Sequence, residues 1–455
     1  MFVATFRNMT NLQKYDIPVP RYTSYPTVPF WDHESFKIQA YENSLQSAYW
    51  ESSKEVSLYL HLPFCESLCT YCACNTRITK NHSVEEKYIK YLLKEWDLYL
   101  EKLPDVPTIR EVHLGGGTPT FFSPENLEYL LSEILNSANR SKDIQMSFEG
   151  HPANTTGNHL KTLYDLGFDR VSFGIQDFNI NVQKLINRMQ SFEQVKAITE
   201  VAREIGYTSV NYDMVYGLPG QTEESVKSTL EQVISLKPNR IAYYSYAHVP
   251  SIRPAQKSYE EYLPTSNEKW NFMTQGETAF TDAGYEEVGM DHYVLAGDEL
   301  LKAKNEGELH RNFMGYTPFA SKLLIGLGMS AVSDSWSGFA QNEKKLEDYY
   351  ARLDKDELPI SKGHNHTRED LFFRKHILNL MCRYKTDWHH SEFMDFGVSF
   401  NYELLEQLEA EGMIRFTEEG ISVARKGQEI IRIICSTIDA HLNRSSKIPK
   451  FSKAI

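Results

Sequence analysis

The sequence predicts an α/β protein: a (β/α)6 partial TIM-like barrel preceded by an N-terminal arm and followed by a small C-terminal domain. Six short apolar runs alternate with amphipathic helical patterns between residues 56 and 246, which is typical of parallel strands joined by helical crossovers. Nearly every run ends in polar or glycine-rich residues, and barrel enzymes carry their chemistry at these strand ends. A doubly wound sheet remains the alternative.

The expected elements follow one another in a regular order along the chain. The strands are expected over 56–64, 109–114, 144–148, 170–175, 209–215 and 240–246. The helices between them are expected over 84–103, 124–138, 157–166, 192–205 and 223–236. Residues 251–365 are mixed and less regular. From the change of pattern we expect three parts: an N-terminal arm over 1–35, a catalytic domain over 36–365 and a C-terminal domain over 366–455.

The C-terminal domain is predicted to be mostly helical and to resemble a winged helix. Helices are expected over 371–382 and 402–411, a hairpin over 413–425, and a further helix from 428. A winged helix suggests DNA binding. However, residues 366–455 carry 13 Lys and Arg against 13 Asp and Glu, whereas nucleic-acid binders concentrate positive charge. We therefore expect a packing or lid role instead.

Composition and charge exclude several classes of function. The 455 residues carry a net charge of −13, which disfavours a general nucleic-acid binder. No apolar run reaches eighteen residues, so no membrane-spanning helix is expected. The first twenty residues lack the apolar core and cleavage site of a signal peptide, which predicts a cytoplasmic protein. An anionic substrate would need a local concentration of Arg, Lys and His.

Four of the six cysteines lie within ten residues, at 65, 69, 72 and 74. Clustered cysteines in a reducing compartment indicate a metal rather than a disulfide scaffold. Structural zinc prefers four ligands, usually in two pairs, and no second pair exists here. Three close thiolates suit an iron–sulfur cluster in which one iron keeps an open coordination position. Cys382 and Cys435 stand alone in apolar helical patterns and are expected in the core.

Two further features follow the second and third expected strands. Gly115, Gly116 and Gly117 precede Thr118 directly after the strand over 109–114. Glycines allow a close approach of backbone and ligand, but this loop has neither the dinucleotide-binding nor the P-loop pattern. Glu149 closes the third strand and is either a solvated strand-end carboxylate or a ligand contact.

The segment Cys65-Glu-Ser-Leu-Cys69-Thr-Tyr-Cys72 resembles the cysteine motif of the radical S-adenosylmethionine (SAM) superfamily. The resemblance implies that these three cysteines hold a 4Fe–4S cluster whose open iron binds SAM. Reductive cleavage of SAM needs the low end of iron–sulfur potentials, which implies a low-potential electron donor. The glycine-rich loop one strand later resembles the loop that holds the methionyl end of SAM in this superfamily.

A closer resemblance, to the oxygen-independent coproporphyrinogen III oxidase family, runs over nearly the whole chain. It rests on Arg21-Tyr-Thr-Ser-Tyr-Pro-Thr27, His61-Leu-Pro-Phe-Cys65, Cys72-Ala-Cys74-Asn75, residues 115–120, Gly174-Ile-Gln-Asp-Phe178, Asn187-Arg188, Asp213, Tyr216-Gly-Leu-Pro219, Tyr246-Ala-His248, Gly289-Met-Asp-His292 and His310-Arg-Asn-Phe313. The segment 21–27 and Cys74 separate this family from heme chaperones, heme degradases and radical SAM methyltransferases, which are the rival classes.

This resemblance implies a set of site residues. Cys65, Cys69 and Cys72 would hold the cluster, and Cys74 would not. Two SAM molecules would bind, and the residues at the family's SAM-contacting positions are Tyr59, Tyr71, Gly116, Gly117, Thr118, Glu149, Gln176, Arg188, Asp213, Ala247 and Val332. The chain departs from the family pattern at Gly150-His151 and over 317–322, which bears on substrate contacts more than on the radical chemistry.

The implied reaction converts coproporphyrinogen III to protoporphyrinogen IX in heme biosynthesis, and two propionates become vinyl groups with loss of carbon dioxide. The substrate carries four carboxylates, for which Arg21, Arg253, His310 and Arg311 are the candidates. No acid–base catalyst is expected because the cofactor performs the difficult step. The expected partners are the substrate, a low-potential electron donor and an unidentified electron acceptor, with no nucleic acid and no membrane. A monomer is expected, with the arm over 1–35 closing the barrel mouth.

Overall fold

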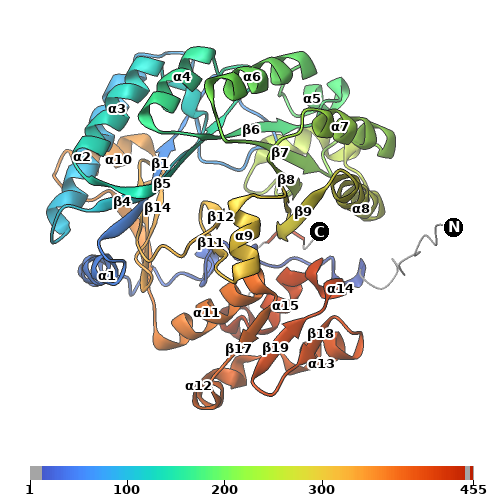
Figure 1. Cartoon of the computed structure of the whole chain (residues 1–455). Coiled ribbons are helices and arrows are strands. Elements are labelled where there is room, and N and C mark those ends of the chain that lie inside the picture. Colours follow the sequence, from blue (N-terminus) through green and yellow to red (C-terminus); the bar gives the residue numbers. More distant parts are fainter. Residues whose placement is uncertain (1–12, 446–450, 454–455) are drawn as a thin grey trace.

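The protein is described by a computed structural model that places residues 13–445 and 451–453. Its central sheet has twelve strands in the order β16-β15-β14-β13-β1-β4-β5-β6-β7-β8-β10-β9. The six expected strands are neighbours in chain order and run parallel: β1 (Glu55–Leu62), β4 (Thr108–Gly116), β5 (Asn139–Gly150), β6 (Arg170–Gln176), β7 (Ser209–Tyr216) and β8 (Arg240–Ser245). A doubly wound sheet reverses its strand order at a switch point. The unbroken order confirms the partial barrel (Figure 1).

The five expected helices cover the outside of this barrel (Figure 1). They are α2 (Val84–Lys102), α3 (Pro124–Asn136), α4 (Gly157–Leu166), α6 (Phe192–Ile205) and α7 (Glu223–Ser235). Thr156, Ser191 and Thr222 begin three of them with capping boxes, which satisfy free amides of the first turn. Gly167 and Gly206 end two of them with φ values of 111° and 119°, a conformation that glycine adopts without steric cost.

The parallel strands alternate between an apolar outer face and a polar inner face. In β7, Val210 and Tyr212 are buried in the main core, whereas Asn211 and Asp213 line an internal cavity. Successive side chains of a strand point to opposite faces, so the outer face packs against the helices and the inner face lines the barrel. The hydrophobic core therefore lies between strands and helices, and the barrel interior is left polar.

The region that the sequence left irregular extends the sheet at both edges. On one edge β13 (Leu324–Leu327) pairs parallel with β1, and β14 (Val332–Asp334), β15 (Gly338–Asn342) and β16 (Ile360–Asn365) follow antiparallel. On the other edge β10 (His292–Leu295) and β9 (Tyr285–Gly289) follow β8. These strands have three to six residues, too few to show a clear period in the sequence.

The remaining elements connect this frame or brace it. They are α1 (Ile38–Glu51), β2 (Phe64–Cys65), β3 (Arg77–Ile78), α5 (Ile180–Leu185), α8 (Ser266–Asp282), α9 (Glu299–Glu306), β11 (His310–Asn312), β12 (Gly315–Thr317) and α10 (Leu346–Leu353). The β11–β12 hairpin and α9 lie at the open side of the barrel (Figure 1). Within the described part of the chain, no helix is both long enough and apolar enough to cross a membrane.

The C-terminal part combines helices with a three-stranded sheet of order β17-β19-β18. Its elements are α11 (Arg368–Arg383), β17 (Lys385–Asp387), α12 (His390–Phe396), α13 (Tyr402–Ala410), β18 (Ile414–Phe416), β19 (Gly420–Val423), α14 (Arg425–Gln428), α15 (Ile431–Thr437) and α16 (Ala440–Arg444). The helix expected from 428 begins slightly later, as α15 at Ile431: the short helix α14 ends at Gln428, and Ile430 has the non-helical angles φ −113° and ψ 28°. The other expected elements are present.

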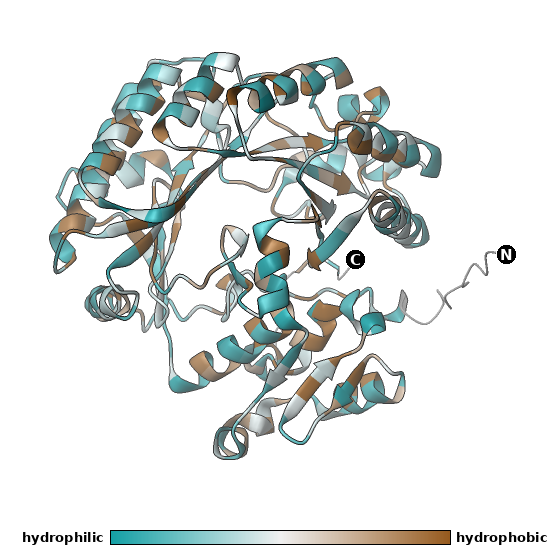
Figure 2. Cartoon of the chain, viewed as in Figure 1, coloured by the Kyte–Doolittle hydropathy of each residue, from teal (hydrophilic) through white to brown (hydrophobic). Residues whose placement is uncertain are grey.

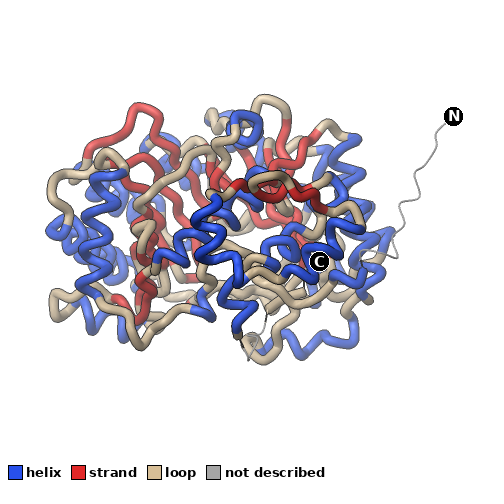
Figure 3. The backbone as a smooth tube through the Cα atoms, turned by 90° about the horizontal axis from the view of Figure 1, so that it is seen from below, coloured by secondary structure: helices blue, strands red, loops and turns tan. Residues whose placement is uncertain are grey.

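The arm is part of a second hydrophobic core rather than a loose cover. Its side chains Tyr22, Tyr25 and Trp31 are buried, and the two tyrosines pack in a cluster with residues of α11 and α15. Tyr22 donates a hydrogen bond to Asp439 at 3.1 Å. Residues 1–12 of the predicted arm lie outside the described residues. Figure 2 shows apolar residues on the C-terminal helices and strands, and Figure 3 shows the whole molecule from below.

Candidate active site

The cysteine segment is the loop between β2 and β3, directly after the first barrel strand. These two short strands pair in parallel and close the loop at its base. Cys65, Cys69 and Cys72 are half-buried, whereas Cys74 is exposed. All four line one cavity of about 420 Å³ at the carboxyl ends of the strands. The predicted gathering of the cysteines at a strand end is therefore present.

The glycine-rich loop is bound to the cysteine loop through its backbone. The amide of Gly117 donates to the carbonyl of Leu62 at 2.9 Å, and the amide of Thr118 donates to that of Phe64 at 3.0 Å. The Thr118 hydroxyl lies 3.3 Å from the sulfur of Cys65. A Cβ atom on Gly117 would lie 2.6 Å from the carbonyl carbon of Pro63. Glycine is thus required here for the approach of two backbones, in addition to any ligand.

A buried arginine places positive charge beside the cysteines. Arg188 donates from Nη2 to the carbonyl of Gly174 at 2.6 Å, and its Nη1 lies 3.6 Å from the sulfur of Cys69. Its Nε atom is buried without a hydrogen-bond partner. Burial, followed by the Arg188 charge, lowers the pKa of nearby His151 to about 3, so this histidine is neutral. An anion or a thiolate-bound cluster would be stabilised by the Arg188 guanidinium.

Two carboxylates also line this cavity. Glu149 accepts a hydrogen bond from the amide of Gly116 at 3.3 Å. Asp213 accepts one from the Ser172 hydroxyl at 3.1 Å. Burial, followed by the neighbouring Glu149 charge, raises the pKa of Asp213 to about 7. The cavity thus combines an arginine beside the cysteines with carboxylate acceptor oxygens, as a zwitterionic ligand with hydroxyl groups would need.

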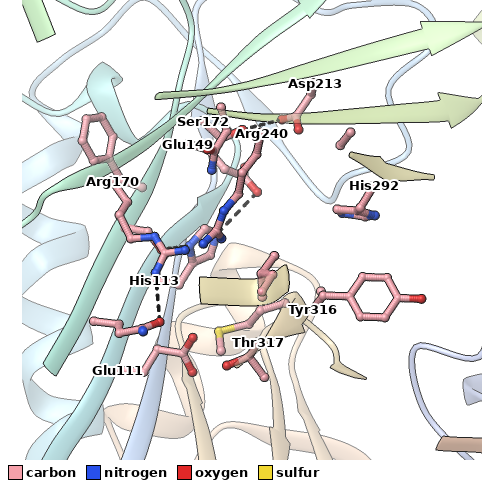
Figure 4. A pocket seen from close by; sticks show the side chains of 18 of the residues that line it. Glu111, His113, Glu149, Arg170, Ser172, Asp213, Arg240, His292, Tyr316 and Thr317 are labelled. Carbon is pink, nitrogen blue, oxygen red and sulfur yellow. Dashed lines mark hydrogen bonds and ion pairs between the residues drawn. The ribbon is translucent and has the colours of Figure 1, made fainter. Parts of the chain in front are cut away.

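A second cavity of about 170 Å³ fills the barrel interior (Figure 4). It shares Glu149, Ser172, Asp213 and Tyr244 with the first cavity, so the two adjoin. The inner faces of five strands, β4 to β8, add His113, Ser147, Arg170, Asn211 and Arg240 to its lining. Sequence reasoning missed these residues. The sequence signal that could have identified them is the alternation, with period 2, of polar and apolar residues in strands that are covered by helices on the outside only.

The donor set fits an iron–sulfur cluster better than a single metal ion. Within 13–445 and 451–453, no three His, Cys, Asp or Glu side chains are gathered to hold one ion. In a cubane each thiolate binds a different iron, so the sulfurs lie farther apart than around zinc. Three thiols beside an open cavity, with a buried arginine whose Nε is unpartnered, match a cluster that keeps one iron open.

Most of the residues predicted from the family resemblance come together in the first cavity. Its lining includes the three predicted cluster ligands and Tyr71, Gly116, Gly117, Thr118, Glu149, Gln176, Arg188 and Asp213. Tyr59, Ala247 and Val332 line neither cavity. Tyr59 lies just behind the lining: its ring stacks on His113 with 6.0 Å between ring centroids. The ligand contacts of all these residues stay predictions.

The four candidate carboxylate ligands are separated by the structure. Arg253 donates to the carbonyls of Ala73 and, at 2.9 Å, Cys74, so it braces the cysteine loop. His310 is buried, with its ring 6.2 Å from that of Trp336. None of the four lines either cavity. Arg21 and Arg311 lie instead against aromatic residues that line the barrel interior.

This fold and site define a radical SAM protein, and a model of the radical SAM superfamily matches residues 59–233. The coproporphyrinogen III oxidase of Escherichia coli, a radical SAM enzyme of known structure, superposes with a TM-score of 0.87. It is 35% identical, and the match covers 93% of this chain and 98% of that one.

Curated relatives match over the same extent. The oxygen-independent coproporphyrinogen III oxidase of Helicobacter pylori strain J99 is 37% identical over 454 residues, covering 97% of this chain and 98% of the relative. That of Escherichia coli K12 is 36% identical over 451 residues, covering 98% and 97%. The chain belongs to the oxygen-independent coproporphyrinogen III oxidase family.

Proposed function

We propose that this chain catalyses the oxidative decarboxylation of coproporphyrinogen III to protoporphyrinogen IX in heme biosynthesis. The observation that carries the proposal is the cavity in which the cysteine triplet, the glycine-rich loop, Glu149 and Arg188 come together, in a chain that matches oxidases of this name over its whole length. When bound, the 4Fe–4S cluster and SAM supply a 5′-deoxyadenosyl radical, which removes a hydrogen atom from the propionate β-carbon.

The residues of the chain bind and orient the cluster and SAM and shield them from water. Cys65, Cys69 and Cys72 hold the cluster in this proposal, and the Arg188 guanidinium offsets its negative charge. Glu149 accepts hydrogen bonds from the amino group of SAM. Asp213 lies among buried groups and accepts from ribose hydroxyls.

Further contacts and partners belong to the same proposal. The ring of Tyr71 offers a face to adenine. Two bound SAM molecules, as the family resemblance implies, belong to the same proposal. A low-potential electron donor, an electron acceptor, a cytoplasmic location and a monomeric state complete the proposal.

Anaerobic turnover tests this function directly. The reconstituted protein is incubated with SAM, a low-potential reductant and coproporphyrinogen III, and the vinyl-containing product is measured after oxidation to the porphyrin. We expect protoporphyrin and 5′-deoxyadenosine to form together. A protein that carries its cluster and binds heme but forms no vinyl product would instead be a heme chaperone, and the proposal would be wrong.

A further inference from the structure

Arg311 is a buried cation for which the described part of the chain provides no carboxylate. The residue is only 6% exposed, and the Nε and Nη1 atoms of its side chain are buried without a hydrogen-bond partner. No ion pair involves it among the residues that the structure describes. A buried charge without a counterion destabilises a fold strongly. Such an arginine is understandable if an anion that is not part of the chain completes the site.

The Arg311 guanidinium lies on an aromatic surface beside the inner cavity. It stands 4.6 Å from the ring centroid of Tyr316, whose ring meets that of His292 edge-on at 5.2 Å. The ring of His292 meets that of Tyr244 at 5.6 Å. We call Tyr244, His292 and Tyr316 the aromatic shelf. All three residues line the inner cavity, and Figure 4 labels His292 and Tyr316.

Tyr316 is held in one position by its surroundings. Its hydroxyl accepts from the amide of Met290 at 3.1 Å and donates to the carbonyl of Met381 at 3.2 Å. A Cβ atom on Gly289 would lie 2.4 Å from the Tyr316 ring, so only glycine fits beside it. Because Met290 at the barrel edge and Met381 in α11 both bind this hydroxyl, the Tyr316 ring is fixed. The surface on which the Arg311 guanidinium lies is therefore fixed as well.

A second guanidinium reaches the same shelf from the arm. Arg21 lies 5.8 Å from the ring centroid of Tyr244. Its two contacts, with the carboxylate of Asp291 and the carbonyl of Ser245, are both long at 3.4 Å. The preceding residue is fixed, since Arg432 donates to the carbonyl of Pro20 at 3.0 Å. Arg21 is therefore placed by its backbone while its side chain is only weakly bound.

His292 keeps the middle of the shelf neutral. Its Nδ1 lies 2.8 Å from the carbonyl of Met290 and must donate to it, which leaves Nε2 to accept from the Tyr244 hydroxyl at 3.4 Å. Burial lowers the pKa of His292 to about 4, and the charges of Arg311 and Arg21 add to this shift. His292 therefore orients Tyr244 and adds no charge between the two arginines.

We propose that Arg311 and Arg21 form a carboxylate subsite that binds a propionate of the tetrapyrrole substrate. Apolar pyrrole rings would lie on the aromatic shelf, and Tyr316 and His292 act as positioning residues. This subsite rests on the proposed function and makes it specific: two of the four predicted carboxylate ligands belong to it, and Arg253 and His310 do not.

Coproporphyrin III is the probe, because its four carboxylates match those of the substrate and its fluorescence reports binding without turnover. Its tetramethyl ester, which has no carboxylate, is the comparison ligand. In holoprotein, Arg311→Met should weaken coproporphyrin III binding about 10- to 100-fold, as expected for the loss of charge-assisted hydrogen bonds. Arg21→Met should weaken it about 3- to 10-fold, because that side chain is 28% exposed. Ester binding should change little.

Arg374 provides a matched control for Arg311. It is buried and stacks on Trp336 at 4.3 Å, but it has its own counterion, Asp334, at 3.0 Å. Arg374→Met leaves that carboxylate buried without a partner and should lower the melting temperature clearly. Arg311→Met removes an uncompensated charge and should leave the melting temperature of the ligand-free protein unchanged or raise it.

The outcomes separate the subsite from the proposed function. If Arg311→Met binds coproporphyrin III as tightly as the native protein, or loses affinity for the ester equally, the subsite is wrong. If Arg311→Met melts as early as Arg374→Met, Arg311 is structural and the subsite is also wrong. A native protein that binds the tetracarboxylate through Arg311 but forms no vinyl product supports the subsite and contradicts the proposed function.

Discussion

Replacing Gly117 with alanine should separate the two loops that build the cluster site. The added Cβ would lie 2.6 Å from the carbonyl carbon of Pro63 and 2.8 Å from the carbonyl oxygen of Leu62, against about 3.4 Å for an ordinary contact. One backbone must therefore move by ~0.8 Å (from 2.6 to about 3.4 Å), and the 2.9 Å bond from Gly117 to Leu62 is lost or stretched. Overpacking of this kind costs about 1–3 kcal/mol.

The displaced segment, Leu62–Pro63, ends two residues before the proposed cluster ligand Cys65. Cluster binding should therefore decrease more than the stability of the fold. Misplacement by about 1 Å reduces rates on the order of 100-fold when reacting groups must align. We expect Gly117→Ala to retain less iron after anaerobic reconstitution and to bind SAM more weakly, as measured by iron analysis and titration calorimetry.

Gly157→Ala is the matched control for this change. Its Cβ would meet its nearest atom at 3.6 Å, so the fold should be unchanged or more stable by about 0.4–1 kcal/mol. Native iron content and SAM affinity in Gly117→Ala would refute the reasoning that glycine is needed for the backbone contact.

Two other predictions concern the cysteines and a buried carboxyl. Alanine at Cys65, Cys69 or Cys72 should abolish the cluster, whereas Cys74→Ala should keep it; equal iron loss in Cys74→Ala would show that the ligands are misassigned. Glu95 is fully buried, and burial raises its pKa to about 8 despite hydrogen bonds that lower it. The folded state then binds a proton more tightly than the unfolded state, so stability should fall as pH rises from about 5 to 8. Urea unfolding of the native protein and of the non-titrating Glu95→Gln measures this, and a pH-independent difference between the two would contradict it.

The barrel and the cluster site were predictable because each leaves a local pattern in the sequence. Strands that alternate with capped helices specify the parallel order, and three cysteines within eight residues can be brought together by a single loop. Site residues such as Arg188 and Asp213 could be predicted only from the resemblance to a family. They lie on different elements, and no spacing relates them to the cysteines before the strands are arranged.

The inner cavity and the sheet edges were missed for physical reasons. His113 and Asn211 look like ordinary half-exposed strand residues until it is known that the barrel is closed enough to shield them. The strands from β13 to β16 are short and pair mainly with each other, so their stability comes from the sheet and not from local propensity. The unpartnered nitrogens of Arg311 are likewise visible only when all neighbours have been placed.

The arm shows why the C-terminal part matters to the barrel. Tyr22 and Tyr25 are buried against α11 and α15, and the Asp439 carboxylate accepts from the Tyr22 hydroxyl. Removing the arm would therefore expose a hydrophobic core as well as open the barrel, and a point change at Arg21 is the cleaner test of its role. Arg432 and Asp439 of the C-terminal part bind the arm on both sides of Arg21, whose guanidinium lies against Tyr244 at the edge of the inner cavity. The C-terminal part, with its balanced charge, thus has a sufficient physical role here: it holds a cationic side chain against an aromatic residue of the cavity in which the substrate is proposed to bind.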